Sequence, residues 1–194
     1  MKTVLFILSI VILSACSPKP ESSVQSEAIQ APIVSSAAGQ PEMKSSLPDL
    51  GLAPELTTEV WLNTPMPLRI SDLKGNVVML EMWTYGCINC RNVIPSLKDF
   101  HSKYAKEGLV IIGNHFPEFD QERDLQNLTD SVKKLGILYP VAQDNDGMTW
   151  RAYNNKYWPT LYLIDKTGHI RYTHIGEGNY EKTEEAIQSL LAEK

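Results

Sequence analysis

The chain has 194 residues, of which 43% are hydrophobic and 21% are charged, and its formal net charge is −5. This length suits one folded domain of ordinary size with shorter flanking segments. The negative charge and the absence of a basic cluster exclude nucleic acid as an expected partner.

The first fifteen residues have the pattern of a secretory signal. Lys2 precedes an uncharged apolar run over 3–13, and small residues then lead to Cys16. Such a run is too short to cross a bilayer comfortably, but it suits a signal peptide. The sequence Leu13-Ser14-Ala15-Cys16 resembles the lipobox of bacterial lipoproteins, whose cysteine is acylated and becomes the first residue of the mature chain. We therefore expect a signal peptide at 1–15 and a lipid on Cys16; an ordinary signal with an incidental cysteine is the alternative.

Residues 16–46 are expected to form a lipidated, disordered tether. Ser, Pro, Ala, Gln and Glu dominate this segment, which has no aromatic residue and no sustained periodicity. It cannot bury enough apolar surface to offset the entropy of ordering. Its root-mean-square reach is on the order of 30 Å. The domain is thus expected on the extracytoplasmic, periplasmic side of a membrane, and Ser17, which is not Asp, favours the outer membrane.

Residues 47–194 alternate strand and helix patterns and read as one α/β domain, with a central mixed sheet flanked by helices. In chain order the patterns predict a short N-terminal β-hairpin (60–62 with 68–70), a buried strand (76–83), a helix from Cys87 to before Gly108, a buried strand (109–114), a helix (121–135), a short strand (140–143), a short helix (148–153), strands at 158–165 and 169–175, and a closing helix (180–191).

The sequence Cys87-Ile88-Asn89-Cys90 raises three possibilities: a redox pair, half of a metal site, or a haem attachment point. Haem attachment needs a His directly after the second cysteine, where this chain has Arg91. Structural zinc usually needs four ligands, and the chain has no second cysteine pair or closely spaced His pair. The motif therefore favours a redox-active disulfide, with no metal and no other cofactor.

The expected helix gives the two cysteines different roles. A sulfur at a helix N-terminus meets unpaired backbone N–H groups and the positive end of the helix dipole, and both favour the thiolate. Cys87 is thus the expected attacking sulfur, and Cys90, one turn further in, would resolve the mixed disulfide. Pro95 is expected to kink this helix.

Several residues around the pair recur in the order found in one family. They are Glu81 and Trp83 before Cys87, Pro95 after Cys90, Pro159-Thr160 at the start of a strand, and Gly168 and Gly176 beyond it. With them, residues 55–192 resemble thioredoxin-fold proteins of the TlpA/ResA type, and most closely the thioredoxin-like domain of DipZ proteins. The segment between Cys90 and Pro159 leaves room for the strand and helix inserted before the cis-proline in TlpA-like proteins.

The resemblance implies a protein-disulfide oxidoreductase. It implies a cis peptide bond between Trp158 and Pro159, which would place that backbone beside the disulfide as a docking edge for a client's extended chain. It supports Glu81 as a base for Cys90, provided that Glu81 is buried; an outward-facing carboxylate is the alternative. The expected substrate-contacting residues are Trp83, Tyr85 and Trp158.

The direction of electron flow is expected to be reductive. Gly86 replaces the Trp that thioredoxin carries before its first cysteine, and Ile88-Asn89 replaces Gly-Pro. An aliphatic residue and a neutral amide supply no charge to stabilise a thiolate strongly, as a DsbA-type oxidant requires. We expect a monomer that reduces disulfides in exported proteins and is recharged by a membrane electron donor of the DipZ or CcdA type.

A second hypothesis is a copper-binding or copper-delivery lipoprotein. It requires Cys87, Cys90 and His115 to converge, as in Sco-like proteins, although those carry a wider cysteine spacing. A peroxidase is a weaker alternative: Thr84 echoes a peroxiredoxin motif, but Leu80 stands where that motif has Pro.

Overall fold

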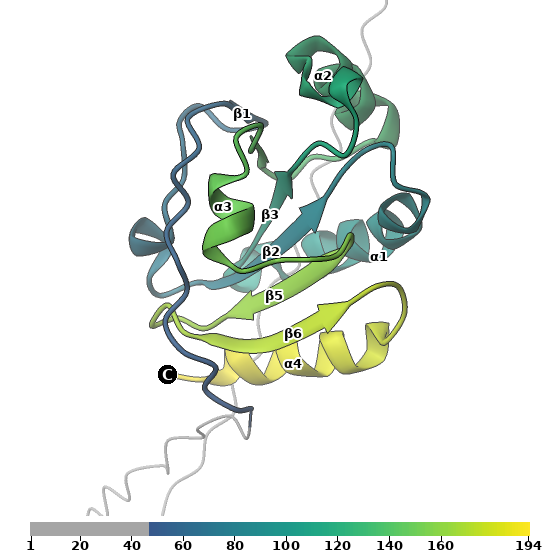
Figure 1. The fold of residues 1–194 in the computed structure, drawn as a ribbon. Coiled ribbons are helices and arrows are strands. Elements are labelled where there is room, and N and C mark those ends of the chain that lie inside the picture. The colour runs from purple at the N-terminus through teal and green to yellow at the C-terminus, as the bar shows by residue number, and fades with distance from the viewer. Residues whose placement is uncertain (1–46) are drawn as a thin grey trace, which may run out of the picture. The chain divides into compact units, whose positions relative to one another are not determined.

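The computed structural model describes residues 47–194, so the predicted signal peptide, lipidation at Cys16 and tether lie outside the described residues. The described chain forms a six-stranded mixed sheet in the order β1-β4-β3-β2-β5-β6 (Figure 1). The strands are β1 (Trp61–Leu62), β2 (Val77–Trp83), β3 (Leu109–His115), β4 (Val141–Gln143), β5 (Thr160–Ile164) and β6 (Ile170–Ile175). This confirms the predicted α/β architecture with a mixed sheet.

Helices and an N-terminal segment cover the two faces of the sheet. The helices are α1 (Ile88–Tyr104), α2 (Leu125–Leu135), α3 (Met148–Ala152) and α4 (Tyr180–Ala192), with 3-10 turns η1 (Ile70–Leu73), η2 (Ala105–Glu107) and η3 (Asp120–Arg123). α1, α2 and α4 contribute to one apolar cluster, and residues of the N-terminal segment, η1 and Tyr153 beside α3 contribute to the other. The elements β3, α2, β4 and α3 lie between α1 and Pro159.

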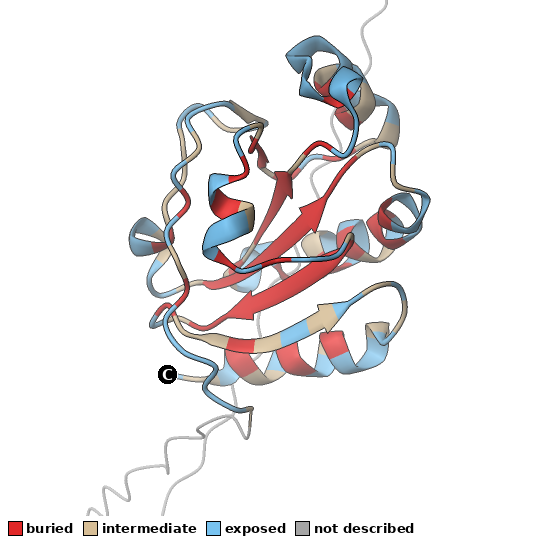
Figure 2. Ribbon diagram, viewed as in Figure 1, coloured by how far each residue is buried: buried red, intermediate tan, exposed pale blue. Residues whose placement is uncertain are grey.

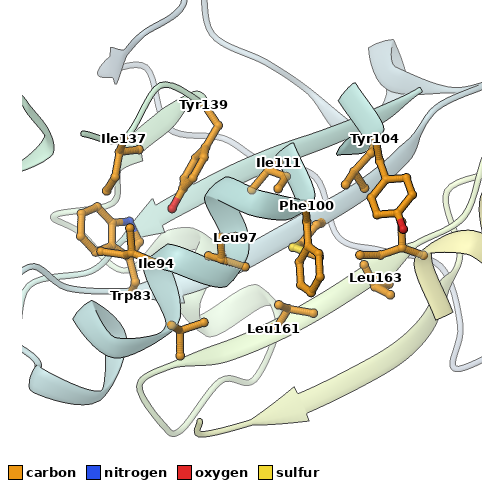
Figure 3. Packing of buried hydrophobic residues seen from close by; sticks show 14 of the residues in the cluster. Trp83, Ile94, Leu97, Phe100, Tyr104, Ile111, Ile137, Tyr139, Leu161 and Leu163 are labelled. Carbon is orange, nitrogen blue, oxygen red and sulfur yellow. The ribbon is translucent and has the colours of Figure 1, made fainter. Parts of the chain in front are cut away.

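β2 is the centre of the sheet, and its burial explains its apolar sequence. It pairs in parallel with β3 and antiparallel with β5. All seven of its residues are buried, as Figure 2 shows. A strand covered on both faces reads as a continuous apolar run because neither set of alternating side chains meets water. On one face, Trp83 packs in the same cluster as Leu97 and Phe100 of α1 (Figure 3).

The predicted N-terminal β-hairpin is wrong. β1 pairs antiparallel with β4, through Trp61 opposite Ala142, rather than with residues 68–70. Asn63 has a φ of 60° and its side chain donates hydrogen bonds to the carbonyls of Ile137 and Tyr139, which turns the chain toward β4. Residues from Ile70 onward form η1 instead, because the Glu55 carboxylate accepts hydrogen bonds from the first N–H groups of that turn.

The helix predicted over 121–135 is divided in two. Asp124 has an extended backbone, with φ −72° and ψ 124°, and separates η3 from α2. Its carboxylate accepts a hydrogen bond from the N–H of Asn127 at 2.8 Å, so Asp124 caps α2. Local side-chain capping by Asp competes with helix continuation at this position.

The two ends of the sheet have different neighbours. β2 and β3 run in parallel with Trp83 opposite His115, so their carboxyl ends meet at the edge where Cys87 follows. The described chain begins at the other end, where Leu50 and Ala53 donate backbone hydrogen bonds to Ile170 and Gly168. Within residues 47–194, no helix is long and apolar enough to cross a membrane.

Candidate active site

The two cysteines occupy different environments at the N-terminus of α1. Cys87 is the residue before the helix, half-buried, and its Sγ accepts a hydrogen bond from the N–H of Cys90 at 3.4 Å. Cys90 lies in the first turn and is fully buried. Both are free thiols. A solvent-reachable sulfur therefore sits at the helix end, with a second sulfur enclosed behind it.

Glu81 is buried beneath α1, where its carboxylate faces the hydroxyl of Tyr139. Its exposed fraction is 0%, and within residues 47–194 neither carboxylate oxygen meets the full geometry of a hydrogen bond, although Tyr139 lies close enough to influence it. Burial raises the pKa of the Glu81 carboxyl from an ordinary value of 4.5 to about 8, and the nearby Tyr139 hydroxyl opposes that rise. A small cavity beside it is lined by Pro159, Val93 and Leu97, among others. The outward-facing alternative for Glu81 is therefore wrong.

The Cys90 thiol and Glu81 influence one another. Burial first, and then the charge of Glu81, raise the pKa of the Cys90 thiol above its ordinary range. A buried thiol with a raised pKa stays protonated and is a weak nucleophile until a neighbouring base takes its proton. Tyr139, a buried residue that the sequence did not indicate, also faces this pair: burial and then the Glu81 charge raise its pKa.

The predicted cis peptide bond between Trp158 and Pro159 is confirmed. Thr160, the first residue of β5, pairs with Met82, so Pro159 lies at the same edge of the sheet as the end of β2. Trp158 is half-buried and packs against Trp150 at 4.4 Å and Phe116 at 5.7 Å between ring centroids.

The three residues expected to contact substrate differ in their exposure to solvent. Trp83 is fully buried, packs edge-on to His115 at 5.4 Å, and lies so close to Gly113 that a Cβ there would be 2.8 Å from the indole nitrogen. The prediction that Trp83 contacts substrate directly is therefore wrong, because both faces of β2 are covered. Tyr85 and Trp158 are both partly exposed.

A second buried carboxylate, Glu122, lies beside the loop that leads to Cys87. Its Oε2 accepts a hydrogen bond from the Thr84 hydroxyl at 2.6 Å, and the Thr84 oxygen lies 3.2 Å from Nε2 of His115. All three side chains are fully buried. The sequence alone did not indicate Glu122, because an acid in a polar stretch is expected to be solvated. The available signal was its place after β3, whose carboxyl end meets that of β2.

The copper hypothesis lacks the geometry that it requires. Among residues 47–194, no group of three His, Cys, Asp or Glu side chains is arranged to hold a metal ion. His115 instead faces Thr84 and is enclosed by Trp83 and Tyr85, with ring centroids at 5.4 Å from each.

The peroxidase alternative also lacks support in the structure. It would need the Thr84 hydroxyl to act on a peroxide at Cys87, but this hydroxyl donates its hydrogen to Glu122.

Residues 51–173 match the family model of the AhpC/TSA family. The chain belongs to this family. It is 42% identical over 150 residues to the protein DipZ of Mycobacterium bovis, covering 76% of this chain and 22% of that protein. It is 28% identical over 141 residues to the thiol-disulfide oxidoreductase YkuV of Bacillus subtilis, covering 72% of this chain and 94% of that one.

The fold also matches solved structures of thioredoxin-like proteins. A putative thiol:disulfide interchange protein DsbE from Chlorobium tepidum is 26% identical, with a TM-score of 0.66 over 75% of this chain and 99% of that one. These findings confirm the thioredoxin-like fold and the resemblance on which it was predicted. The chain spans about a fifth of the length of the DipZ relatives.

Proposed function

We propose that this AhpC/TSA family member is a thiol-disulfide oxidoreductase that reduces disulfides in exported proteins through Cys87 and Cys90. The observation that carries the proposal is the pairing of a half-exposed sulfur at a helix N-terminus with a buried sulfur beside the buried carboxylate of Glu81. The names of relatives such as YkuV and ResA, both thiol-disulfide oxidoreductases, support it.

The reaction proceeds by two sulfur displacements. The Cys87 thiolate attacks one sulfur of the client disulfide, which forms a mixed disulfide and releases the client's other sulfur as a thiolate. Glu81 accepts the Cys90 proton, and the Cys90 thiolate attacks Cys87 Sγ and expels the second client thiolate. Two electrons pass to the client and the protein leaves as the Cys87–Cys90 disulfide. The Trp158–Pro159 backbone and Tyr85 would contact the client's chain.

The residues around the pair favour a reducing potential. Ile88 and Asn89 carry no charge, Arg91 on α1 is exposed, and the Glu81 charge opposes ionisation of the buried sulfur. A strong oxidant instead needs an unusually stabilised reduced form. Recharging then requires a dithiol donor, for which we propose a membrane protein of the DipZ or CcdA type.

Equilibration of the purified protein with glutathione tests this direction. The reduced fraction, measured by alkylation and mass spectrometry, should give a potential toward the thioredoxin value of roughly −270 mV. Reduction of insulin by the same sample should be lost in the Cys87→Ser variant. A potential above about −160 mV, nearer to the DsbA range, would overturn the reductase proposal.

The location is proposed from the N-terminal sequence: a lipoprotein on the extracytoplasmic side of a membrane. The place where the described chain begins is compatible with such an anchor. Arg171 of β6 donates hydrogen bonds to the carbonyls of Leu47 and Pro48, at the end of the sheet opposite Cys87. The first described residues therefore lie away from the two cysteines.

Replacing Cys16 with Ser should move the protein from the membrane fraction to the soluble fraction. Disulfide-reductase activity of the released protein should stay within about twofold, because residues before Leu47 are no part of the proposed site. Immunoblotting of fractionated cells, with Ser17→Ala as the matched control, measures the change. Retention of the Cys16→Ser variant in membranes would contradict anchoring through this residue.

A further inference from the structure

The carboxylate of Glu122 joins two loops at the edge of the sheet where the cysteines lie. Its Oε2 accepts hydrogen bonds from the Thr84 hydroxyl at 2.6 Å, the Glu118 N–H at 2.7 Å and the Phe119 N–H at 3.2 Å. Thr84 belongs to the loop between β2 and Cys87, and the other two residues belong to the loop after β3. One buried oxygen therefore holds both loops.

Capping of η3 accounts for part of this arrangement. A Glu near the start of a helix often accepts a hydrogen bond from an N–H just before it, as Glu122 does from Phe119. Such a cap requires neither complete burial nor a partner on another loop. Glu122 is fully buried and bonds Thr84, which precedes it by a whole helix and strand. The bond to Thr84 therefore calls for a role beyond capping.

The second oxygen of Glu122 lies against Gly86, directly before Cys87. A Cβ on Gly86 would be 2.0 Å from this Oε1, so a side chain at this position would have to displace the buried carboxylate. The φ of Gly86 is not among the positive values, so its backbone would accept other residues. Oε1 has no hydrogen-bond partner among residues 47–194. The Glu122 carboxylate therefore packs directly against the residue that precedes Cys87.

His115 completes the connection to Thr84. The single hydroxyl hydrogen of Thr84 is donated to Glu122, so Nε2 of His115 is the donor to the Thr84 oxygen. Burial lowers the pKa of His115 to about 4, and the ring is therefore neutral near pH 7. The Thr84 hydroxyl is held from both sides.

The loop after β3 also carries Phe116, which stacks on Trp158 beside Pro159. We propose that Glu122 is a positioning residue for client recognition, fixing the Thr84–Cys87 loop relative to Phe116 and Trp158 so that an extended client segment meets both in one geometry. The inference rests on the proposed oxidoreductase function. A client chain contacts Cys87 and the Trp158 backbone together, whereas a small disulfide needs only Cys87.

The comparison of a protein substrate with a small one tests this role. Glu122→Ala, Glu122→Gln and the control Asp120→Ala, which removes an exposed acid from the same turn, are prepared in the full-length chain in mild detergent. Insulin and hydroxyethyl disulfide serve as substrates. Glu122→Ala should raise the insulin KM at least about fivefold, with kcat and the hydroxyethyl disulfide rate within about twofold. Glu122→Gln keeps an acceptor oxygen and should stay within about twofold, as should Asp120→Ala.

A proportional loss with both substrates, or an unchanged insulin KM in Glu122→Ala, would overturn the inference. If Glu122→Ala does not fold by thermal melting, Thr84→Val and Thr84→Ser decide instead, because only Ser keeps the hydroxyl that Glu122 holds. The inference then requires a raised insulin KM in Thr84→Val alone. Failure of the unaltered chain to reduce either substrate above the Cys87→Ser blank would overturn the proposed function itself.

Discussion

The Cys90→Ala variant should lose disulfide-reductase turnover by at least about a thousandfold, equivalent to roughly 4 kcal/mol in the activation free energy, and should accumulate covalently bound client. Cys87 remains half-exposed at the N-terminus of α1 and can still attack a disulfide. No other described cysteine can displace the client from the mixed disulfide, because Cys87 and Cys90 are the free cysteines of residues 47–194. Non-reducing electrophoresis with mass spectrometry of the adducts measures the trapped fraction.

The matched control is Cys87→Ser, which should lose turnover equally and trap no client. Cys90 is fully buried, so it cannot reach a client disulfide when Cys87 is absent. Adducts formed by Cys87→Ser, or turnover retained by Cys90→Ala, would reverse the assignment of the two sulfurs.

The sequence predicted the parts of the fold that depend on local pattern. β2 was predictable because a strand covered on both faces is apolar at every position, and α1 because its buried residues, such as Val93, Leu97 and Phe100, recur at helical spacing. The hairpin was not predictable, because the partner of Trp61 lies at Ala142 in β4 and no local signal marks that pairing. Antiparallel pairing between residues so far apart in the chain depends on how the other strands of the sheet are arranged.

In the candidate site, too, features that depend on local sequence were predictable and features that depend on long-range packing were not. The cysteines and Pro159 could be proposed from the sequence because their residue types and order are those that the chemistry requires. Trp83 was misassigned because a continuous apolar run does not show which of its side chains reach the surface. Glu122 was missed because its burial arises from the register of β2 with β3, which brings the loop after His115 against Thr84.

Glu81 links the stability of the domain to pH. The folded-state pKa is about 8 against an ordinary value of 4.5, so the folded protein retains a proton that the unfolded chain releases. The free energy of unfolding therefore falls as pH rises through this window, and the loss is complete above pH 8. A shift of this size corresponds to roughly 5 kcal/mol at most, since each pKa unit is worth about 1.4 kcal/mol. Below pH 4.5 the carboxyl is neutral in both states and the penalty is absent.

The Glu81→Gln variant should consequently be more stable than the unaltered protein at pH 9 by several kcal/mol, and similar to it at pH 4.5. Its turnover should fall by about a hundredfold, because an amide cannot accept the Cys90 proton. Urea unfolding at the two pH values measures the first effect. The disulfide form is used so that thiol titrations do not enter the comparison. Glu107→Gln, at an exposed acid of η2, is the control and should change neither quantity appreciably. The two effects have one cause: a desolvated carboxylate destabilises the fold when it ionises, and the same desolvation makes it a stronger base toward the Cys90 proton. Equal stability of Glu81→Gln and the unaltered protein at pH 9 would show that Glu81 is hydrated or paired in solution, and an unchanged turnover would remove it from the resolving step.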